Sequence, residues 1–286
     1  CLGNEAITLY DTSLAIATLN TLNGNTTGAL NAGTVNTLTG AAATMNTVYT
    51  AACNGEISNL GNEAITLDDT SLAVPKLNTL YGNTTGAVNA ATVTTLTGAA
   101  AAVITSYDSS GITGLGNEKL TLSGSTSVAN ANTLAADTTG VITATITETD
   151  AATLATLNET TNAYTITVGD TSVTAANLNT IDGATTVAVT ATAVTTITGA
   201  ASAVNTAYAS SGINGLGNEA ITLDDTTLAV ATLNTLNGNT TGVVNAATVA
   251  TLTGAAAAMN TAYTAGGNSE ISGLGNEAIT LDDTTL

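Results

Sequence analysis

The chain has 286 residues, of which 44% are hydrophobic, yet it has no Phe, Trp or His. Its 21 acidic residues stand against 2 basic ones, and the net charge of -19 excludes the cationic footprint that nucleic-acid binding needs. The same charge disfavours anionic membranes, and no apolar run approaches the roughly 18 residues of a membrane span. With only 8% charged residues and a mean hydropathy of +0.32, the chain is expected to fold.

Internal repetition is the strongest signal in the sequence. Strand-like segments begin near residues 7, 65, 120, 166, 221 and 279, and all but the fourth follow the tetrapeptide Leu-Gly-Asn-Glu. We therefore interpret residues 1–286 as a single continuous repeat array. Because residues 274–281 repeat residues 2–9 and Cys1 stands in mid-repeat, we expect the array to be a fragment of a longer chain.

The first part of each repeat predicts a strand followed by a helix. Residues 64–67 alternate between polar and β-branched or apolar side chains, as a short strand does. Residues 69–71 are good N-cap residues for a helix over residues 72–81, and Gly82 stands where a C-cap glycine belongs.

The second part of each repeat predicts the same plan with an insertion. Residues 87–90 are expected to be extended, and residues 92–97 to be helical and closed by Gly98. The insertion, residues 99–107, predicts an Ala-rich helix that ends in a recurrent tyrosine, found at Tyr49, Tyr107, Tyr208 and Tyr263.

A strand and a helix every 22 residues or so cannot bury an apolar face alone, but stacked copies can. The sequence therefore predicts the α/β class, as a repeat solenoid of about ten strand–helix coils with a parallel sheet on one side and short helices on the other. We expect one parallel sheet to contain the segments at Ile7, Ala29, Ile65, Ala87, Leu120, Val141, Ile166, Ala188, Ile221, Val243 and Ile279. Thr-x-Thr runs such as residues 143–145 and 165–167 are not expected to be in register across coils.

Catalytic side chains are not indicated. Nucleophilic and acid–base catalysis usually recruits His, a tuned Cys or Lys, or an opposed carboxylate pair. His is absent, Lys76 and Lys119 are solitary, and Cys1 and Cys53 occupy positions that are not equivalent in the repeat. We predict that the chain is not an enzyme, has no catalytic residue and binds no organic cofactor.

Acidic residues recur after the first strand of the repeat, and they are the candidate metal ligands. The preferred interpretation is that one Asp of each pair caps a helix and complements its dipole. The alternative is a Ca²⁺ site made by carboxylates of stacked coils. The candidates are Asp68, Asp69, Asp224, Asp225, Asp282 and Asp283, with single residues at Asp11 and Asp170.

Asn-Glu is the most regular polar pair. We expect the Asn to close a turn and the Glu to face solvent at the edge of the strand. The pairs are Asn4-Glu5, Asn62-Glu63, Asn117-Glu118, Asn218-Glu219 and Asn276-Glu277.

The runs ITLDDTSLAVPKLNTLYGNTTGAVNAATVTTLTGAAAAV and ITATITETDAATLATLNETTNAYTITVGDTSVTAANLNTIDG resemble Thr/Ala-rich tandem repeats of very large secreted cell-surface proteins of bacteria, particularly cyanobacteria. The resemblance covers the whole chain but carries no functional residue to transfer. It implies an extracellular or cell-surface location and a structural role.

We therefore expect a structural repeat module of an extracellular filament, sheath or surface-layer protein. The alternatives are the stalk of a giant secreted adhesin, or a Ca²⁺-dependent ice- or carbohydrate-binding module. The expected partner is the chain itself, by end-to-end or lateral assembly, or further repeats of the same chain.

Overall fold

The structure is a computed structural model that describes residues 3–283. The chain divides into two compact units, residues 1–144 and residues 145–286, and each is considered by itself. Whether the two continue one uninterrupted array stays a prediction. Cys1 lies outside the described residues, and Cys53 is an exposed free thiol.

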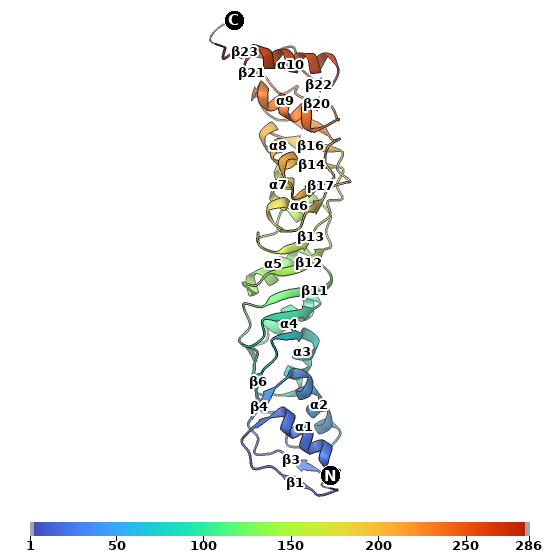
Figure 1. The fold of residues 1–286 in the computed structure, drawn as a ribbon, viewed down its shortest axis with the longest axis vertical. Coiled ribbons are helices and arrows are strands. Elements are labelled where there is room, and N and C mark those ends of the chain that lie inside the picture. Colours follow the sequence, from blue (N-terminus) through green and yellow to red (C-terminus); the bar gives the residue numbers. More distant parts are fainter. Residues whose placement is uncertain (1–2, 284–286) are drawn as a thin grey trace. The chain divides into compact units, whose positions relative to one another are not determined.

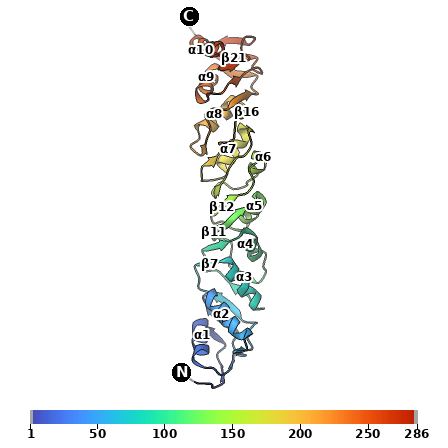
Figure 2. The same ribbon diagram turned by 90° about the vertical axis from the view of Figure 1, so that its right-hand side faces the viewer.

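Each unit contains a stack of helices in chain order (Figures 1 and 2), and consecutive helices of a unit pack side by side. In the first unit they are α1 (Ile16–Asn25), α2 (Ala42–Cys53), α3 (Val74–Asn83), α4 (Ala100–Tyr107) and α5 (Val128–Asp137). In the second unit they are α6 (Ala151–Leu154), α7 (Ala175–Gly183), α8 (Ala201–Ala209), α9 (Val230–Asn239) and α10 (Ala256–Gly267).

The strands of the first unit pair in parallel across successive coils, where a coil is one helix with the strands that lead to it. One sheet has the order β1 (Ile7–Thr8), β3 (Leu30–Asn31), β5 (Ile57–Ser58). A second has the order β2 (Ser13–Ala15), β4 (Thr37–Gly40), β6 (Ala64–Leu67), β8 (Val88–Asn89), β10 (Ile112–Thr113). In a third, β9 (Thr95–Gly98) lies between β7 (Ser71–Ala73) and β11 (Lys119–Thr126).

The second unit follows the same plan. Its longest sheet has the order β14 (Ser172–Thr174), β16 (Thr196–Gly199), β18 (Ala220–Leu223), β20 (Val244–Asn245), β22 (Ile271–Ser272). The others pair β15 (Val189–Thr190) with β17 (Ile213–Asn214), and β19 (Thr227–Ala229) with β21 (Thr251–Gly254) and β23 (Ala278–Leu281). The remaining strands are β12 (Ile142–Ile146) and β13 (Ala163–Thr165).

The core lies between the sheets and the helices. Apolar side chains on neighbouring strands are in register, as Leu38, Ile65 and Val88 are, and all three are buried. Strand neighbours lie about 4.8 Å apart, so these aliphatic side chains stack directly on one another. The facing helices contribute residues at spacing three, such as Leu77 and Leu80, which are fully buried.

The predicted α/β repeat solenoid is confirmed, with strand–helix coils and only parallel strand pairing among the described residues. The prediction of one sheet for all first and second segments is wrong, because these segments fall into several sheets. Single threonines stand opposite one another on three adjacent strands, at Thr174, Thr198 and Thr222, but the next strand carries Asn245 there.

The sheets are separate because some coils have an extra strand. Three strands, β5, β6 and β7, lie between α2 and α3, whereas two lie between α3 and α4. The middle strand, β6, pairs with β4 on one side and β8 on the other. In the first two coils this sheet supplies the strand directly before the helix, β2 before α1 and β4 before α2. In later coils it supplies the strand directly after the helix, β8 after α3 and β10 after α4.

Two local assignments from the sequence were wrong. Residues 95–98 form strand β9, not the end of a helix, and α4 begins at Ala100. Gly82 lies inside α3 and is not a C-cap, while Gly98 ends β9 with a φ of +152°. A Cβ at Gly98 would lie 2.4 Å from Cγ1 of Val74, so this glycine allows the chain to pass over the neighbouring helix.

Gly98→Ala is expected to lower the free energy of unfolding by about 1–3 kcal/mol, because an L side chain is strained at this φ and collides with Val74. The matched control is Gly82→Ala, where nothing lies within 4 Å and a helical alanine should stabilise by up to about 1 kcal/mol. Urea unfolding followed by circular dichroism measures both. Equal effects of the two substitutions would contradict the assigned role of Gly98.

Candidate functional site

The glutamates of the Leu-Gly-Asn-Glu motif are buried, not exposed. Glu63, Glu118 and Glu219 have 0% of their surface accessible, so the prediction of a solvent-facing Glu is wrong for these three. A buried carboxyl group is costly unless its oxygens accept hydrogen bonds. The partners of these carboxyl groups are therefore the central feature of the site.

Each of these carboxyl groups accepts a hydrogen bond from a tyrosine at the end of the preceding helix. The Tyr49 hydroxyl donates to Glu63 Oε2 at 2.8 Å. Tyr107 donates to Glu118 and Tyr208 to Glu219, both at 2.7 Å. Tyr263 donates to Glu277 at 2.9 Å. The recurrent tyrosine noted in the sequence is thus the partner of the recurrent glutamate.

Backbone N–H groups of the motif itself complete the set. The Gly61 N–H donates to both carboxyl oxygens of Glu63, at 3.1 and 2.9 Å. Gly61 has a φ of +132°, a conformation that favours glycine and turns its N–H toward the carboxyl group. In Glu219, Oε2 accepts from the Tyr208 hydroxyl and from the Gly217 and Asn218 N–H groups, while the buried Oε1 has no partner.

The following coil holds the backbone of the same glutamate. The Thr84 hydroxyl donates to the Glu63 carbonyl at 2.9 Å and accepts from the Gly86 N–H at 3.0 Å. Thr138 and Thr240 donate likewise to the carbonyls of Glu118 and Glu219. We call each such set a Glu–Tyr–Thr cluster: Glu63 with Tyr49 and Thr84, Glu118 with Tyr107 and Thr138, and Glu219 with Tyr208 and Thr240.

One coil of the second unit replaces the cluster. Helix α6 has only four residues and brings no tyrosine. Tyr164 occupies the position that Glu has in the other coils. The Thr185 hydroxyl donates to the Tyr164 carbonyl at 2.7 Å, just as the Thr240 hydroxyl donates to the Glu219 carbonyl. The Tyr164 side chain is buried, and burial raises its pKa to about 12. Both members of the Glu–Tyr pair are lost together.

The clusters leave the carboxyl groups inaccessible to a solute. Burial, followed by the hydrogen bond to Glu63, raises the pKa of Tyr49 well above its ordinary value of 10.0. Tyr107 and Tyr208 have raised pKa values for the same reasons, with Glu118 and Glu219 as their partners. The site therefore keeps tyrosine neutral as a donor and joins neighbouring coils.

The second Asp of each pair caps a helix, but not the helix that follows it. Asp69 Oδ2 accepts from the Ala42 N–H at 2.7 Å, at the start of α2 in the preceding coil. Asp225 does the same for Ala201 of α8, and Asp283 for Ala256 of α10, each at 2.7 Å. Asp170 accepts from Ala151 of α6 at 2.6 Å. The cap therefore crosses from one coil to the next.

The first Asp of each pair is exposed, and these residues are Asp68, Asp224 and Asp282. Among residues 3–283, no three or more His, Cys, Asp or Glu side chains are grouped so that they could hold one metal ion. The Ca²⁺ site stays a hypothesis that rests on the exposed carboxylates and the net charge.

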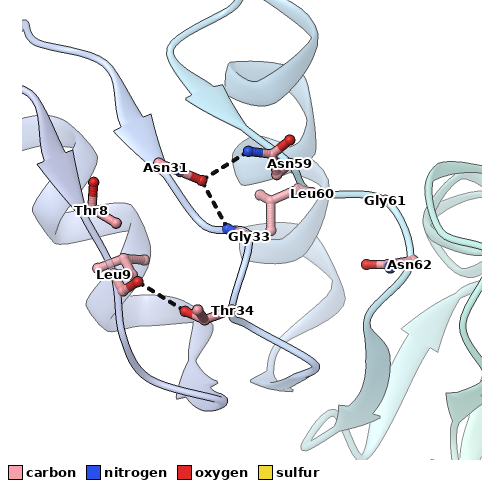
Figure 3. A pocket seen from close by; sticks show the side chains of 9 residues that line it. All are labelled: Thr8, Leu9, Asn31, Gly33, Thr34, Asn59, Leu60, Gly61 and Asn62. Carbon is pink, nitrogen blue, oxygen red and sulfur yellow. Dashed lines mark hydrogen bonds between the residues drawn. The ribbon is translucent and has the colours of Figure 1, made fainter.

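A shallow polar hollow of about 590 Å³ lies beside β3 (Figure 3). The Asn59 amide donates to Asn31 Oδ1 at 2.8 Å, and the Gly33 N–H donates to the same oxygen at 3.0 Å. Asn59 has a φ of +62°, where the corresponding residue Gly114 has +84°. Gly33 faces Asn59, whereas Ala91 faces Gly114. A Cβ added at Gly114 would lie 2.7 Å from the backbone nitrogen of Ala91. In this coil the glycine is Gly33, on the segment after β3, whereas in the later coil it is Gly114, on the segment opposite Ala91.

No protein-family model, curated protein or solved structure matches the chain. Among the described residues, none of the helices has the length and apolar character required to cross a membrane.

The free energy of unfolding is expected to fall as the pH rises above about 10, since tyrosines with raised pKa stay neutral in the fold but ionise in the unfolded chain. Their stabilising contribution is complete below the unfolded pKa and is lost as the pH rises toward the folded pKa. Urea unfolding between about pH 8 and pH 11.5 measures this pH dependence.

Tyr49→Phe should lower the free energy of unfolding by about 1.5–3 kcal/mol near pH 8 and flatten its decrease at alkaline pH. The fully exposed Tyr10 (83% accessible) supplies the control Tyr10→Phe, which should change neither.

Asp225→Ala is expected to lower the free energy of unfolding by about 1 kcal/mol, because it leaves the first N–H of α8 without its acceptor. Asp224→Ala removes the same charge one residue away from an exposed side chain and should change stability by less than about 0.5 kcal/mol. Thermal and urea unfolding of the two variants, compared at equal ionic strength, test the cross-coil cap. A larger loss for Asp224→Ala would contradict it.

Proposed function

We propose that this chain is a structural repeat module of an extracellular filament, sheath or surface layer, and that it works by stacking with itself or with further repeats. The observation that carries the proposal is that the buried polar groups of one coil find their partners on adjacent coils. In the Glu–Tyr–Thr clusters, the glutamate takes a partner from the coil before it and another from the coil after it.

Side-chain amides on the helices support the same role. Asn78 of α3 donates to the Ala102 carbonyl of α4 at 2.9 Å. Asn179 of α7 donates to Ala203 of α8, and Asn234 of α9 to Ala258 of α10, also at 2.9 Å. These bonds connect α3 with α4, α7 with α8, and α9 with α10, and the Asp caps add contacts from the following coil to α2, α6, α8 and α10. Polar contacts of this kind make a coil a unit for stacking.

The apolar core of a coil is likewise completed by the coil that stacks on it. Ile221 and Leu223 on β18 are each 1% accessible, because β20 covers them. Ile279 and Leu281 occupy the same positions on β23, which has a strand on one side within the described residues, and they are 45% and 44% accessible. Stability in such a fold is a sum over nearest neighbours, which suits a long, thin assembly.

The surface chemistry suits the proposed extracellular setting. A net charge of -19 keeps the surface soluble and attracts cations. With only 2 basic residues, the chain offers few sites to trypsin-like proteases. Durability and solubility are what an extracellular coat or filament requires.

Electron microscopy of the native material tests the proposal. The expected result is an extended filament or a lattice whose axial spacing matches stacked strands, about 4.8 Å in fibre diffraction. An isolated thread that ends in a separate globular domain would instead favour the adhesin stalk. A compact, monodisperse native particle without any extended array would contradict both.

A further inference from the structure

We propose that the array is built from interchangeable pairs of coils, in which the interface between one pair and the next is shared and the interface within a pair fits only its own two coils. A coil pair is the coil of α1 with that of α2, α3 with α4, α7 with α8, or α9 with α10. The inference rests on the proposed stacking role and deepens it, because it names the element that can be added or reordered in such an array.

Four hydrogen bonds join the last helix of one pair to the first coil of the next. Where α2 meets α3, the first is the bond from the helix-terminal tyrosine to the buried glutamate, and the second is the Asp cap. The Asn46 amide of α2 makes the other two. It donates to the Lys76 carbonyl at 2.9 Å and accepts from the Asn83 amide at 3.3 Å.

The same four bonds recur where α8 meets α9. The tyrosine bond and the Asp cap are both present. The Asn205 amide donates to the Thr232 carbonyl at 3.1 Å and accepts from the Asn239 amide at 3.0 Å. Yet the helices that meet are of different kinds: α2 has 12 residues and α8 has 9, and the next helix carries Tyr81 in one case and Asn237 in the other. The interface between pairs is thus the same for pairs of different kinds.

The interface within a pair depends on one residue near the end of its first helix. In the α1–α2 pair, the Asn23 amide donates to Glu56 Oε2 at 2.8 Å, in the turn that follows α2. The α9–α10 pair has the same contact, from Asn237 to Glu270 at 3.1 Å. Both second helices have 12 residues. A long second helix therefore occurs together with Asn on the first helix and Glu in the turn.

The other two pairs replace both residues, and their second helices are shorter, with 8 residues in α4 and 9 in α8. The α3–α4 pair has Tyr81 on the helix and Gly111 in the turn, and a Cβ at Gly111 would collide with the Tyr81 ring. In the α7–α8 pair, the Ser210 hydroxyl donates to Asp182 Oδ2 at 2.7 Å, and a Cβ at Gly212 would collide with Asp182 Oδ1. The ring or the carboxylate occupies the space that a glutamate side chain needs.

A second coil taken from one pair therefore does not fit the first coil of a pair of another kind. A glutamate placed opposite Tyr81 meets the ring, and one placed opposite Asp182 meets a like charge. A glycine placed opposite Asn23 leaves the amide without its acceptor. Each first helix selects its own second coil, whereas the end of a second coil accepts different first coils that bring the glutamate and the aspartate.

Exchange of whole coil pairs tests the inference at constant length and composition. The first variant exchanges residues 60–114 with residues 216–273, which contain the α3–α4 and α9–α10 pairs and both begin with Leu-Gly-Asn-Glu. The control exchanges only residues 87–114 with residues 243–273, so that each first helix meets the wrong second coil. Both variants create the same new interfaces after their second coils, and only the control contains mismatched pairs.

Urea unfolding followed by circular dichroism compares the two variants. The whole-pair exchange is expected to unfold within about 0.2 M of the wild-type midpoint, and the control at least about 0.5 M below it. Equal midpoints for the two variants, or a lower midpoint for the whole-pair exchange, would overturn the inference.

Exchange of the selecting residues, Tyr81→Asn together with Asn237→Tyr, provides an independent check, with wild-type numbers kept in every variant. In the control chain the two substitutions restore the match in both pairs and should raise the midpoint to within about 0.2 M of the whole-pair exchange. In the wild-type chain they create the mismatch and should lower the midpoint. A change of the same sign in both chains would refute pair selection. Electron microscopy of the native material is unaffected by these outcomes, so pair selection and the filament proposal fail independently.

Discussion

The structure depends on the satisfaction of a buried carboxyl group by three consecutive segments of chain. Both carboxyl oxygens of Glu63 accept from its own turn and Oε2 also accepts from Tyr49 of the helix before it, while Thr84 of the segment after it donates to its carbonyl. Burying such a group without partners costs several kcal/mol, and losing one hydrogen bond to it costs about 1.5–3 kcal/mol. The group is tolerated only where neighbouring coils are in their correct register.

The alignment of one coil on the next is not fixed by the apolar core. Leu, Ile and Val are the side chains that stack in the ladders, and aliphatic burial is not directional. The Glu–Tyr–Thr clusters and the close approach of Gly86 or Gly242 to a glutamate carbonyl admit only one alignment. The coil with Tyr164 supports this view, since a short helix without tyrosine is matched by a strand without the glutamate. Helix length and strand sequence vary together because they meet in one buried space.

The sequence predicted the parts of the fold that arise from repetition and alternation. Strands at residues 64–67 and 220–223 and the Ala-rich helices were predicted because period and composition report local structure directly. Strand β9 was missed, although its β-branched Thr-Leu-Thr pattern favours a strand, because Leu and Thr spacing in residues 92–97 also fits a helical turn. The division into several sheets depends on the extra strand in the coils of α3 and α9, and spacing alone does not show which strands pair.

The candidate site was predicted only in part, for a related reason. The Asp caps and the recurrent tyrosine were noticed, but each was interpreted within its own coil. The partners lie elsewhere: Asp69 caps a helix that precedes it by 27 residues, and Tyr49 meets a glutamate 14 residues later. The sequence does contain a signal for the Tyr–Glu pair. The tyrosine and the glutamate recur together, and both are missing from the coil of Tyr164. The repeat period shows which residues recur, but it does not show whether a residue finds its partner in its own coil or in a neighbouring one.

A double-mutant cycle between Tyr208 and Glu219 tests the central claim most directly. The free energy of unfolding would be measured for wild type, Tyr208→Phe, Glu219→Gln and the double variant at neutral pH. The account predicts a coupling energy of at least about 1.5 kcal/mol, because a hydrogen bond to a charged or strongly polar buried group joins the two coils. Additivity within about 0.5 kcal/mol would contradict it, because the two side chains would then contribute to stability independently.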